Sequence, residues 1–250
     1  MPLVDLLGRH RDAVEVYGSG LFTTYSEEEL ADQACGWVDA GIRRVKMKIG
    51  LEDGSRAADD LARVAAVRRA VGPDVELMVD ANGAYRVKQA GLVAGNLAAS
   101  SVSYFEEPVP SDRIEDLASV RRQAPMAVAA GEYAYTSRDF LRLLRAEAVD
   151  ILQADATRRL GISGWVKAAT LAEAFGVGFS AHTAPALHAH LGCTAPRIDH
   201  VEYFHDHVRI ERLLFDGPPP LIRGQLRPDL AGPGLGLELK RDDAQQFRVA

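Results

Sequence analysis

The sequence predicts an α/β fold, a parallel barrel of the (β/α)7β type, and two observations carry this prediction. Apolar stretches of strand length alternate with segments of helical periodicity from residue 14 to residue 204, which is typical of a parallel sheet covered by helices. Three acidic residues end such apolar stretches, with 26 residues from Asp80 to Glu106 and 26 more from Glu106 to Glu132. This spacing fits one strand and one helix per carboxylate. An open doubly wound sheet is the alternative, because periodicity does not report closure.

The elements are expected in strict alternation. The segment VEVYGSG at 14–20 reads as the first strand, and Ser26 with Glu29 three residues later predicts a capped helix that stops at Gly41. The later strands are expected at 43–50, 75–80, 101–106, 126–132, 149–155, 177–182 and 197–204. The helices between them are expected at 55–71, 86–99, from 111, from Thr136 or Ser137, at 162–175 and at 186–192.

Three segments of different character make up the chain. Residues 1–13 are interpreted as a linker or a remnant of something upstream, with a short apolar turn that ends at Gly8. Residues 14–204 form the predicted barrel. Residues 205–250 contain the Pro- and Gly-rich stretch DGPPPLIRG and the sequence GPGLGLEL, so we expect an extended C-terminal segment that packs on the barrel.

Composition excludes several classes of protein. With 250 residues, 47% of them hydrophobic, the chain can bury a large core, and its net charge of −6 argues against nucleic acid and anionic membranes as partners. No apolar stretch has the length of a membrane span. Cys35 and Cys193 are the only cysteines, too few for a disulfide framework or a thiolate metal site. A reducing cytoplasm is therefore the expected location.

Carboxylates at the strand ends predict a metal site. Strands of a parallel barrel all point the same way, so Asp80, Glu106 and Glu132 should meet at one mouth, where such enzymes carry their active sites. Three carboxylates there repel one another unless a cation lies between them, and oxygen ligands with room for water suit Mg²⁺. The alternative is that each acid only caps the helix that follows it.

Two groups at the same mouth are candidate acids and bases. Lys46 and Lys48 alternate onto one face of their strand, and we expect burial and like charge to lower the pKa of Lys48 toward neutrality; structural ion pairs with the carboxylates are the alternative. His182 ends the strand next to the one that ends at Asp155, so these two side chains can form a hydrogen-bonded pair.

A zinc site made of the other histidines is the alternative, but these residues lack a ligand spacing typical of such a site. We interpret them as surface or packing residues: His188, His190, His205 and His207.

These motifs together resemble a known family. KMK, VDANG, EEP, GEY, QAD followed by LGISGW, SAH and VEYF occur in the order found in the mandelate racemase group of the enolase superfamily. The resemblance covers residues 14–204, and PGLGLEL is similar to the family's C-terminal segment. Arg158 lies where the muconate-lactonizing and dipeptide-epimerase branches tend to have a lysine, so those branches fit less well.

The resemblance implies a role for each site residue. Asp80, Glu106 and Glu132 would bind Mg²⁺, Lys48 would be the base on one face of the substrate, and His182, held by Asp155, would be the acid or base on the other. Glu202 would hydrogen-bond the substrate carboxylate. Lys46 would lower the pKa of Lys48 and add positive potential, and Asn82 would contact the substrate or the metal shell.

The implied reaction is Mg²⁺-dependent removal of the proton next to a carboxylate through an enediolate. We expect dehydration of a sugar acid, with racemisation or epimerisation of a 2-hydroxy acid by the same site as the first alternative. The family's N-terminal capping domain has no counterpart before residue 14, so the resemblance implies that residues 1–13 are a linker remnant from this missing domain and that residues 14–204 are the catalytic barrel. The second alternative is therefore a weakly active barrel that serves as a binding or assembly module, with a homo-oligomer or a separate capping chain as partner. A barrel metallohydrolase is a third alternative, which would need more metal ligands than these strands offer.

Overall fold

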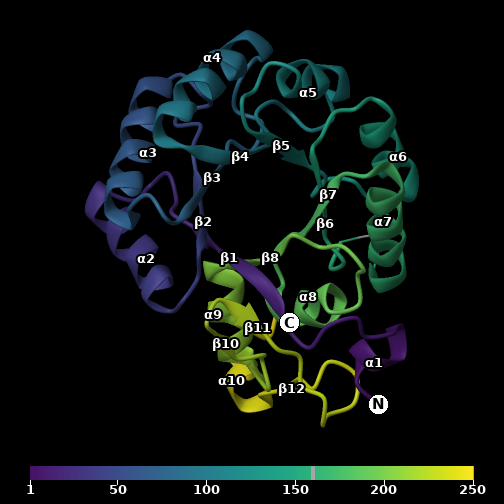
Figure 1. Cartoon of the computed structure of the whole chain (residues 1–250). Coiled ribbons are helices and arrows are strands. Elements are labelled where there is room, and N and C mark those ends of the chain that lie inside the picture. Colours follow the sequence, from purple (N-terminus) through teal and green to yellow (C-terminus); the bar gives the residue numbers. More distant parts are fainter. Residues whose placement is uncertain (159–160, 250) are drawn as a thin grey trace.

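Eight parallel strands close into a ring in the computed structural model, which describes residues 1–158 and 161–249. Closure is made by β1 and β8, whose parallel register pairs Val16 with Val201 and Tyr17 with Glu202. Figure 1 looks into the ring and shows the helices around its outside. The strands are β1 (Val14–Gly20), β2 (Arg44–Lys48), β3 (Glu76–Asp80), β4 (Val102–Glu106), β5 (Ala127–Ala130), β6 (Ile151–Ala154), β7 (Gly178–Ala181) and β8 (His200–Phe204). The predicted closed barrel is confirmed, and the open sheet is wrong.

A helix joins each strand to the next. These are α2 (Glu27–Asp39), α3 (Ala57–Val71), α4 (Val87–Leu97) with the short 3₁₀ turn η1 (Ala98–Ser100), α5 (Ile114–Arg121), α6 (Ser137–Arg145), α7 (Gly161–Phe175) and α8 (Pro185–Gly192). The predicted capping box of α2 is present, because the Ser26 hydroxyl accepts from the Glu29 N–H at 3.2 Å and the Ser26 N–H donates to the Glu29 carboxylate at 2.7 Å. Thr136, not Ser137, caps α6. Leu160, which opens the LGISGW motif, lies outside the described residues.

The core has two layers. The larger lies between the strands and the helices and contains Phe105, Phe140 and Trp165, all fully buried. A smaller cluster inside the ring consists of Tyr17, Met78, Tyr104 and Ala129. This inner layer fills the barrel, so the polar side chains at the strand ends rest on a packed floor and not on a water-filled channel.

The segments outside the ring partly differ from expectation. Helix α1 (Leu3–Leu7) ends before Gly8, as the predicted apolar turn requires. The predicted extended segment is wrong for residues 205–214, which form helix α9 (His205–Leu214) directly after β8. Beyond it, the chain makes the short pieces β9 (Phe215–Asp216), β10 (Leu221–Ile222), β11 (Gln225–Leu226), β12 (Glu238–Leu239) and α10 (Arg241–Gln245).

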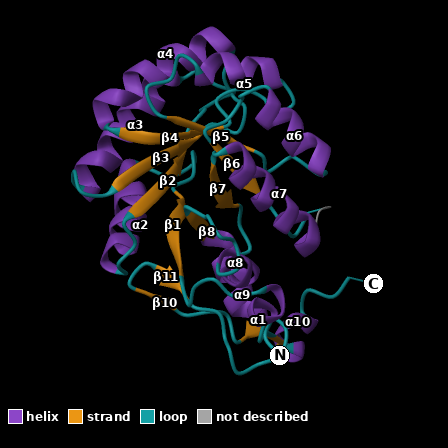
Figure 2. Cartoon of the chain, turned by 45° about the vertical axis from the view of Figure 1, so that its right-hand side comes forward, coloured by secondary structure: helices purple, strands orange, loops and turns teal. Residues whose placement is uncertain are grey.

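Two strand contacts attach this C-terminal segment to the rest of the chain. β11 pairs antiparallel with the start of β1, where Leu226 lies opposite Val14, and Pro2 forms a bridge with Gly234. Figure 2 shows the segment beside α1 and α8, away from the strands β3 to β6. Within the described residues, no helix has the length and apolar character needed to cross a membrane.

Candidate active site

Three buried carboxylates meet at the mouth of the barrel. Asp80 and Glu106 are the last residues of β3 and β4, and Glu132 lies two residues beyond the end of β5. Each offers an oxygen atom within 4.8 Å of the oxygens of the other two. We call these three residues the acidic triad. The alternative that they cap helices is wrong, because the N-cap residues of α4, α5 and α6 are Arg86, Arg113 and Thr136.

The acidic triad fits a hard divalent cation. At about 2.1 Å per Mg–O bond, the ligands of one octahedral ion are about 3.0 to 4.2 Å apart, so the three oxygens, all within 4.8 Å of one another, would have to draw together to bind it. Oε1 of Glu106 is buried and has no hydrogen-bond partner in the described chain. Burial and the charge of Asp80 raise the pKa of Glu106 to about 8. A bound cation would offset both the cost of the unpartnered oxygen and the cost of ionising Glu106 in a buried place.

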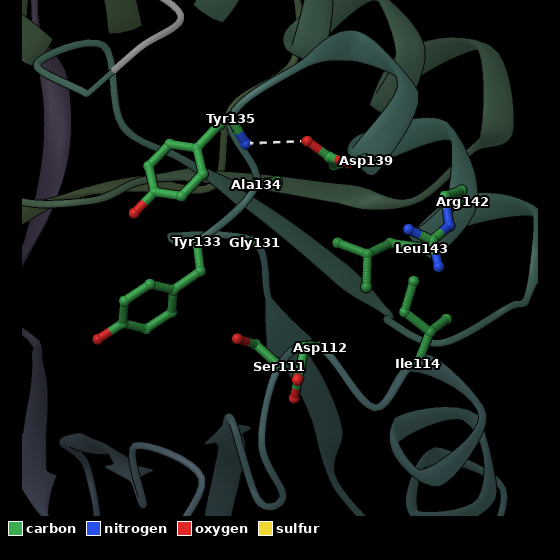
Figure 3. Close-up of a pocket in the computed structure, with 10 residues that line it drawn as sticks. All are labelled: Ser111, Asp112, Ile114, Gly131, Tyr133, Ala134, Tyr135, Asp139, Arg142 and Leu143. Atoms are coloured by element: carbon green, nitrogen blue, oxygen red, sulfur yellow. Dashed lines mark hydrogen bonds between the residues drawn. The ribbon is translucent and has the colours of Figure 1, made fainter.

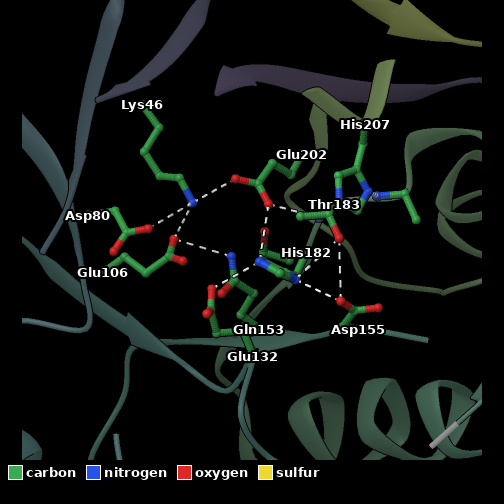
Figure 4. A network of polar contacts seen from close by, with 12 residues as sticks. Lys46, Asp80, Glu106, Glu132, Gln153, Asp155, His182, Thr183, Glu202 and His207 are labelled. Carbon is green, nitrogen blue, oxygen red and sulfur yellow. Dashed lines mark hydrogen bonds and ion pairs between the residues drawn. The ribbon is translucent and has the colours of Figure 1, made fainter. Parts of the chain in front are cut away.

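The two lysines of β2 are paired with these acids. Nζ of Lys46 lies 2.5 Å from Glu106 Oε2 and 3.0 Å from Glu202 Oε1, and the residue is fully buried (Figure 4). Lys48 donates to Asp80, and its side chain retains 18% exposure. The ion pairs of the structural alternative are therefore present. Lys48 alone of this pair reaches solvent, in a cavity of about 450 Å³ that it shares with Phe22.

The pKa of Lys48 is raised by the surrounding protein groups, so the prediction of a lowered pKa is wrong. Burial lowers the pKa of Lys48, as predicted, and so does the charge of Lys46. Burial is the largest single effect, but the carboxylates of Asp80, Glu106 and Glu202 together outweigh it, and the resulting pKa lies above the ordinary value. Like-charge repulsion is outweighed because each lysine has its own carboxylate partner.

The predicted pair of His182 and Asp155 is present. Nδ1 of His182 lies 2.8 Å from Asp155 Oδ2, and Asp155 accepts further hydrogen bonds from the N–H and hydroxyl of Thr157. Nε2 of His182 faces Glu132 Oε2 at 3.0 Å. Burial alone would lower the pKa of His182, but the contacts with Asp155 and Glu132 outweigh it and raise the pKa to about 10. These two carboxylates therefore favour the protonated form of the imidazole.

Glu202 lies between the two halves of the site. Its Oε2 accepts from the Thr183 N–H at 2.8 Å, and its Oε1 faces Lys46. Burial opposes ionisation of Glu202, but Lys46 and His182 hold its pKa well below the usual range. Asn82 has a left-handed backbone with φ of 44°, donates its N–H to Asp80 Oδ1, and lines the cavity beside Lys48.

The sequence interpretation missed two polar groups that support the triad. Gln153 donates to Glu106 Oε2 at 3.2 Å and to the Tyr17 hydroxyl at 3.3 Å, and Tyr17 in turn accepts from Lys46 at 3.2 Å. Gln153 and Tyr17 point into the ring, from strand positions on the same face as the acids. The alternation of β1 and β6 is the signal that could have found them.

Glu107 is a third omission. It follows Glu106 in the EEP motif and is only 1% exposed, and burial together with the charge of Glu132 raises its pKa to about 9. The doubled acid of EEP was the available signal, but a regular strand would have turned its second member away from the mouth.

Arg158 links the pair of His182 and Asp155 to the acidic triad. It donates to the Glu132 carbonyl oxygen, its Nε lies 3.5 Å from Asp155 Oδ2, and its guanidinium lies 4.8 Å from the centre of the Tyr133 ring. Tyr133 is half exposed and also lines a second cavity of about 230 Å³, between the loops that follow β4 and β5 (Figure 3).

The remaining histidines lie outside the metal cluster. His188 and His190 are fully buried and bonded to backbone groups, which confirms a packing role for these two. His207 is half-buried, and its Nδ1 accepts from the Ala184 N–H at 3.1 Å. Among residues 1–158 and 161–249, the acidic triad is the one cluster with the spacing of a metal site.

Comparison with known proteins agrees with this arrangement. A family model described as enolase C-terminal domain-like matches residues 29–244. The chain belongs to this family. A solved mandelate racemase/muconate lactonizing enzyme-like protein from Rubrobacter xylanophilus is 49% identical, with a TM-score of 0.93 over 98% of this chain and 68% of that one. The resemblance to the mandelate racemase group of the enolase superfamily is thereby confirmed.

Members of the family with named activities are also similar. D-galactarolactone cycloisomerase of Agrobacterium fabrum is 33% identical over 97% of this chain and 67% of the cycloisomerase. Arabinonate dehydratase of Saccharolobus solfataricus is 32% identical over 72% of this chain and 48% of the dehydratase. The L-talarate dehydratase of Polaromonas sp. JS666, solved with Mg and L-glucarate, is 32% identical, with a TM-score of 0.88 over 98% of this chain and 66% of that one. The chain thus spans about half to two thirds of the length of these family members.

Proposed function

We propose that this enolase-superfamily chain catalyses Mg²⁺-dependent removal of the proton next to a carboxylate group, with dehydration of a sugar acid as the overall reaction. The observation that carries the proposal is the position of two proton-transfer groups around the acidic triad. Lys48 ends β2, whereas His182 and Asp155 follow β7 and β6, on the far side of the eight-stranded ring. A substrate bound between them would have one such group on each face.

The acidic triad would hold the cation, and a bound Mg²⁺ supplies Lewis-acid stabilisation of the negative charge that develops on the substrate carboxylate. The role of Lys48 is to take the proton at Nζ. It is the more exposed lysine of β2, and its pKa is raised by Asp80. A base role therefore requires that Asp80 turn from Lys48 to another positive partner.

His182 is the proposed acid. It lies between Asp155 and Glu132, whose carboxylates raise its pKa to about 10 and favour the protonated imidazole. A protonated imidazole can donate to a departing β-hydroxyl group, which converts hydroxide into the better leaving group water. This protonation state supports dehydration over a reaction that begins with His182 as base.

Lys46 and Glu202 are proposed to act at the place where the substrate carboxylate binds. Lys46 adds positive potential and holds both Glu106 and Glu202 through ion pairs. A hydrogen bond from Glu202 to the substrate would need a proton on this carboxyl group, and Lys46 favours its ionised form. Glu202→Gln, which keeps an N–H donor, should therefore retain more activity than Glu202→Ala. Asn82, beside Lys48 in the cavity, is proposed to contact the substrate.

The names of similar proteins support a sugar acid as substrate. Dehydratases of arabinonate and of L-talarate/galactarate are about equally similar to the chain. Racemisation is the second candidate, because proton-transfer groups on both faces would also permit return of the proton from the opposite side. The two reactions differ in product, since dehydration releases a 2-keto acid and racemisation returns an isomer of the substrate.

The test is a screen of sugar acids with Mg²⁺ in D₂O, read by formation of a 2-keto acid and by deuterium in recovered substrate. Lys48→Ala should abolish α-proton exchange, His182→Ala should abolish formation of the 2-keto acid, and both variants should keep Mg²⁺ binding intact. An exposed lysine offers a matched control, Lys88→Ala on α4. Loss of Mg²⁺ binding in either site variant, exchange that survives in Lys48→Ala, or 2-keto acid formation that survives in His182→Ala would refute the assigned roles.

A further inference from the structure

Glu107 carries a buried carboxyl group for which the proposed chemistry has no use. The residue is 1% exposed, and its Oε1 has no hydrogen-bond partner in the part of the chain that is described. Burying a carboxyl oxygen without a partner costs free energy. An apolar side chain of similar size would avoid this cost, so we expect the carboxyl group to have a partner outside the described residues.

The backbone at Glu107 is bent at the point where the regular strand ends. Successive side chains of a strand point to opposite faces, so continuation of β4 would direct Glu107 away from Glu106. Instead, Glu107 has a φ of +36°, a left-handed conformation that residues with a side chain rarely adopt. The charged groups that act most strongly on it are the three members of the acidic triad. Strain of this kind persists where the surrounding structure holds it, often at functional sites.

We propose that Glu107 is a fourth carboxylate of the metal site, one that accepts a hydrogen bond from a water molecule bound to the cation. The inference rests on the Mg²⁺ site of the proposed function. Direct ligation is disfavoured by the geometry, because the cluster whose oxygens all lie within 4.8 Å of one another contains the acidic triad and not Glu107.

A water molecule bound to the cation can bridge the distance between the cation and Glu107. Mg²⁺ gives up its water reluctantly and keeps several water ligands when few protein oxygens bind it, and groups that hydrogen-bond to the ligand shell set both its orientation and the affinity. Glu107 thereby acts as a positioning residue: it fixes a water ligand and adds negative charge, while the triad binds the ion. Its unpartnered Oε1 obtains a donor in the same step.

The experiment is calorimetric titration of the whole chain with MgCl₂ alone, for the wild type, Glu107→Gln and Glu107→Asp. Glu115→Gln, on the exposed side of α5, is the matched control for the loss of one acid. We expect one Mg²⁺ per chain in every protein, affinity lower by about 10- to 100-fold in Glu107→Gln, and partial recovery in Glu107→Asp. Thermal unfolding in EDTA should show a midpoint for Glu107→Gln that is equal to or above that of the wild type, since glutamine has the same shape and, unlike the carboxyl group, cannot ionise beside the three acids.

Each of the other possible results of these titrations and thermal scans contradicts one specific statement. Unchanged Mg²⁺ affinity in Glu107→Gln, or a lower midpoint in EDTA as its main effect, would show that Glu107 is structural and overturn the inference alone. Two Mg²⁺ per wild-type chain and one per Glu107→Gln chain would make Glu107 a direct ligand of a second ion and overturn the water-mediated role. Absence of Mg²⁺ binding in the wild type would overturn the proposed metal site together with the inference.

Discussion

Nδ1 of His182 lies 2.8 Å from Oδ2 of Asp155, across the neighbouring strands β7 and β6. This contact orients the ring, so that Nε2 points into the mouth of the barrel toward Glu132. It also stabilises the protonated imidazole, as the raised pKa of His182 shows. The proposed function of this histidine as an acid therefore depends on the charge of a residue 27 positions away in sequence.

Asp155→Asn tests that dependence. The substitution keeps the shape of the side chain and removes its charge, so the pKa of His182 should fall and the dehydration rate at neutral pH should drop by about 10- to 100-fold, the usual cost of losing such a supporting carboxylate. Steady-state rates over a range of pH measure both effects. Asp216→Asn, at a side chain that is 73% exposed, is the control. A rate profile identical to that of the wild type would contradict the coupling.

Magnesium should stabilise the folded chain. At a free concentration about a hundred times Kd, ligand binding adds about 2.7 kcal/mol, which raises the midpoint of thermal unfolding by about 5 to 10 °C in a chain of this size. Thermal scans with EDTA and with millimolar Mg²⁺ measure the difference. The rise should disappear in Glu132→Gln, and a rise of equal size in this variant would place the ion elsewhere.

Gly131→Ala should damage the metal site through the backbone. Gly131 has a φ of 140°, and a Cβ atom there would clash with the carbonyl oxygen of Gln153. Strand β6 and the loop that carries Glu132 must separate to make room, so we expect a loss of about 1 to 3 kcal/mol in unfolding free energy and weaker Mg²⁺ binding. Urea unfolding and calorimetry measure the two effects.

Gly95→Ala is the matched control for that substitution. Gly95 is an exposed residue within α4, and a Cβ atom added there would meet no atom within 4 Å. Alanine should stabilise the helix there by about 0.5 to 1 kcal/mol. Equal effects of the two substitutions would show that the clash at Gly131 does not decide the outcome.

Stability should depend on pH through His200. This histidine is fully inside the barrel, its Nδ1 lies 2.9 Å from the Ser180 hydroxyl, and burial lowers its pKa to about 3. Because the unfolded state binds a proton near pH 6.5 and the folded state does not, this contribution is fully present above that pH and is lost as the pH falls toward 3.

The measurement for His200 compares urea unfolding of the wild type and His200→Phe from pH 7 to pH 4.5. The difference in unfolding free energy should shift against the wild type by up to about 1.4 kcal/mol per pH unit below pH 6.5. Using the difference cancels the opposite contribution of carboxyl groups with raised pKa values, such as Glu211 with a pKa of about 7. A pH-independent difference would mean that His200 is protonated in the folded protein.

Periodicity and residue type predicted the alternation of strands and helices and the acids at the strand ends. These are local properties, because strand and helix periods differ and capping pairs such as Ser26 and Glu29 lie within one turn. Helix α9 escaped prediction for the same reason. It follows Phe204 without a break, and Phe204 gives no side-chain cap, so its start has no local signal.

Long-range contacts decided the rest. Closure depends on pairing between β1 and β8, which are separated by almost the whole barrel sequence. The pKa of Lys48 depends on Asp80 more than on its neighbour Lys46, and Glu107 has a left-handed backbone directly after β4 that no local pattern predicts. The sequence alone identified the acids, the lysines and the histidine of the mouth, but not Tyr17, Gln153 or Glu107. Only the tertiary structure decided which of them touch, because electrostatic and hydrogen-bond energies depend on distances between residues far apart in the chain.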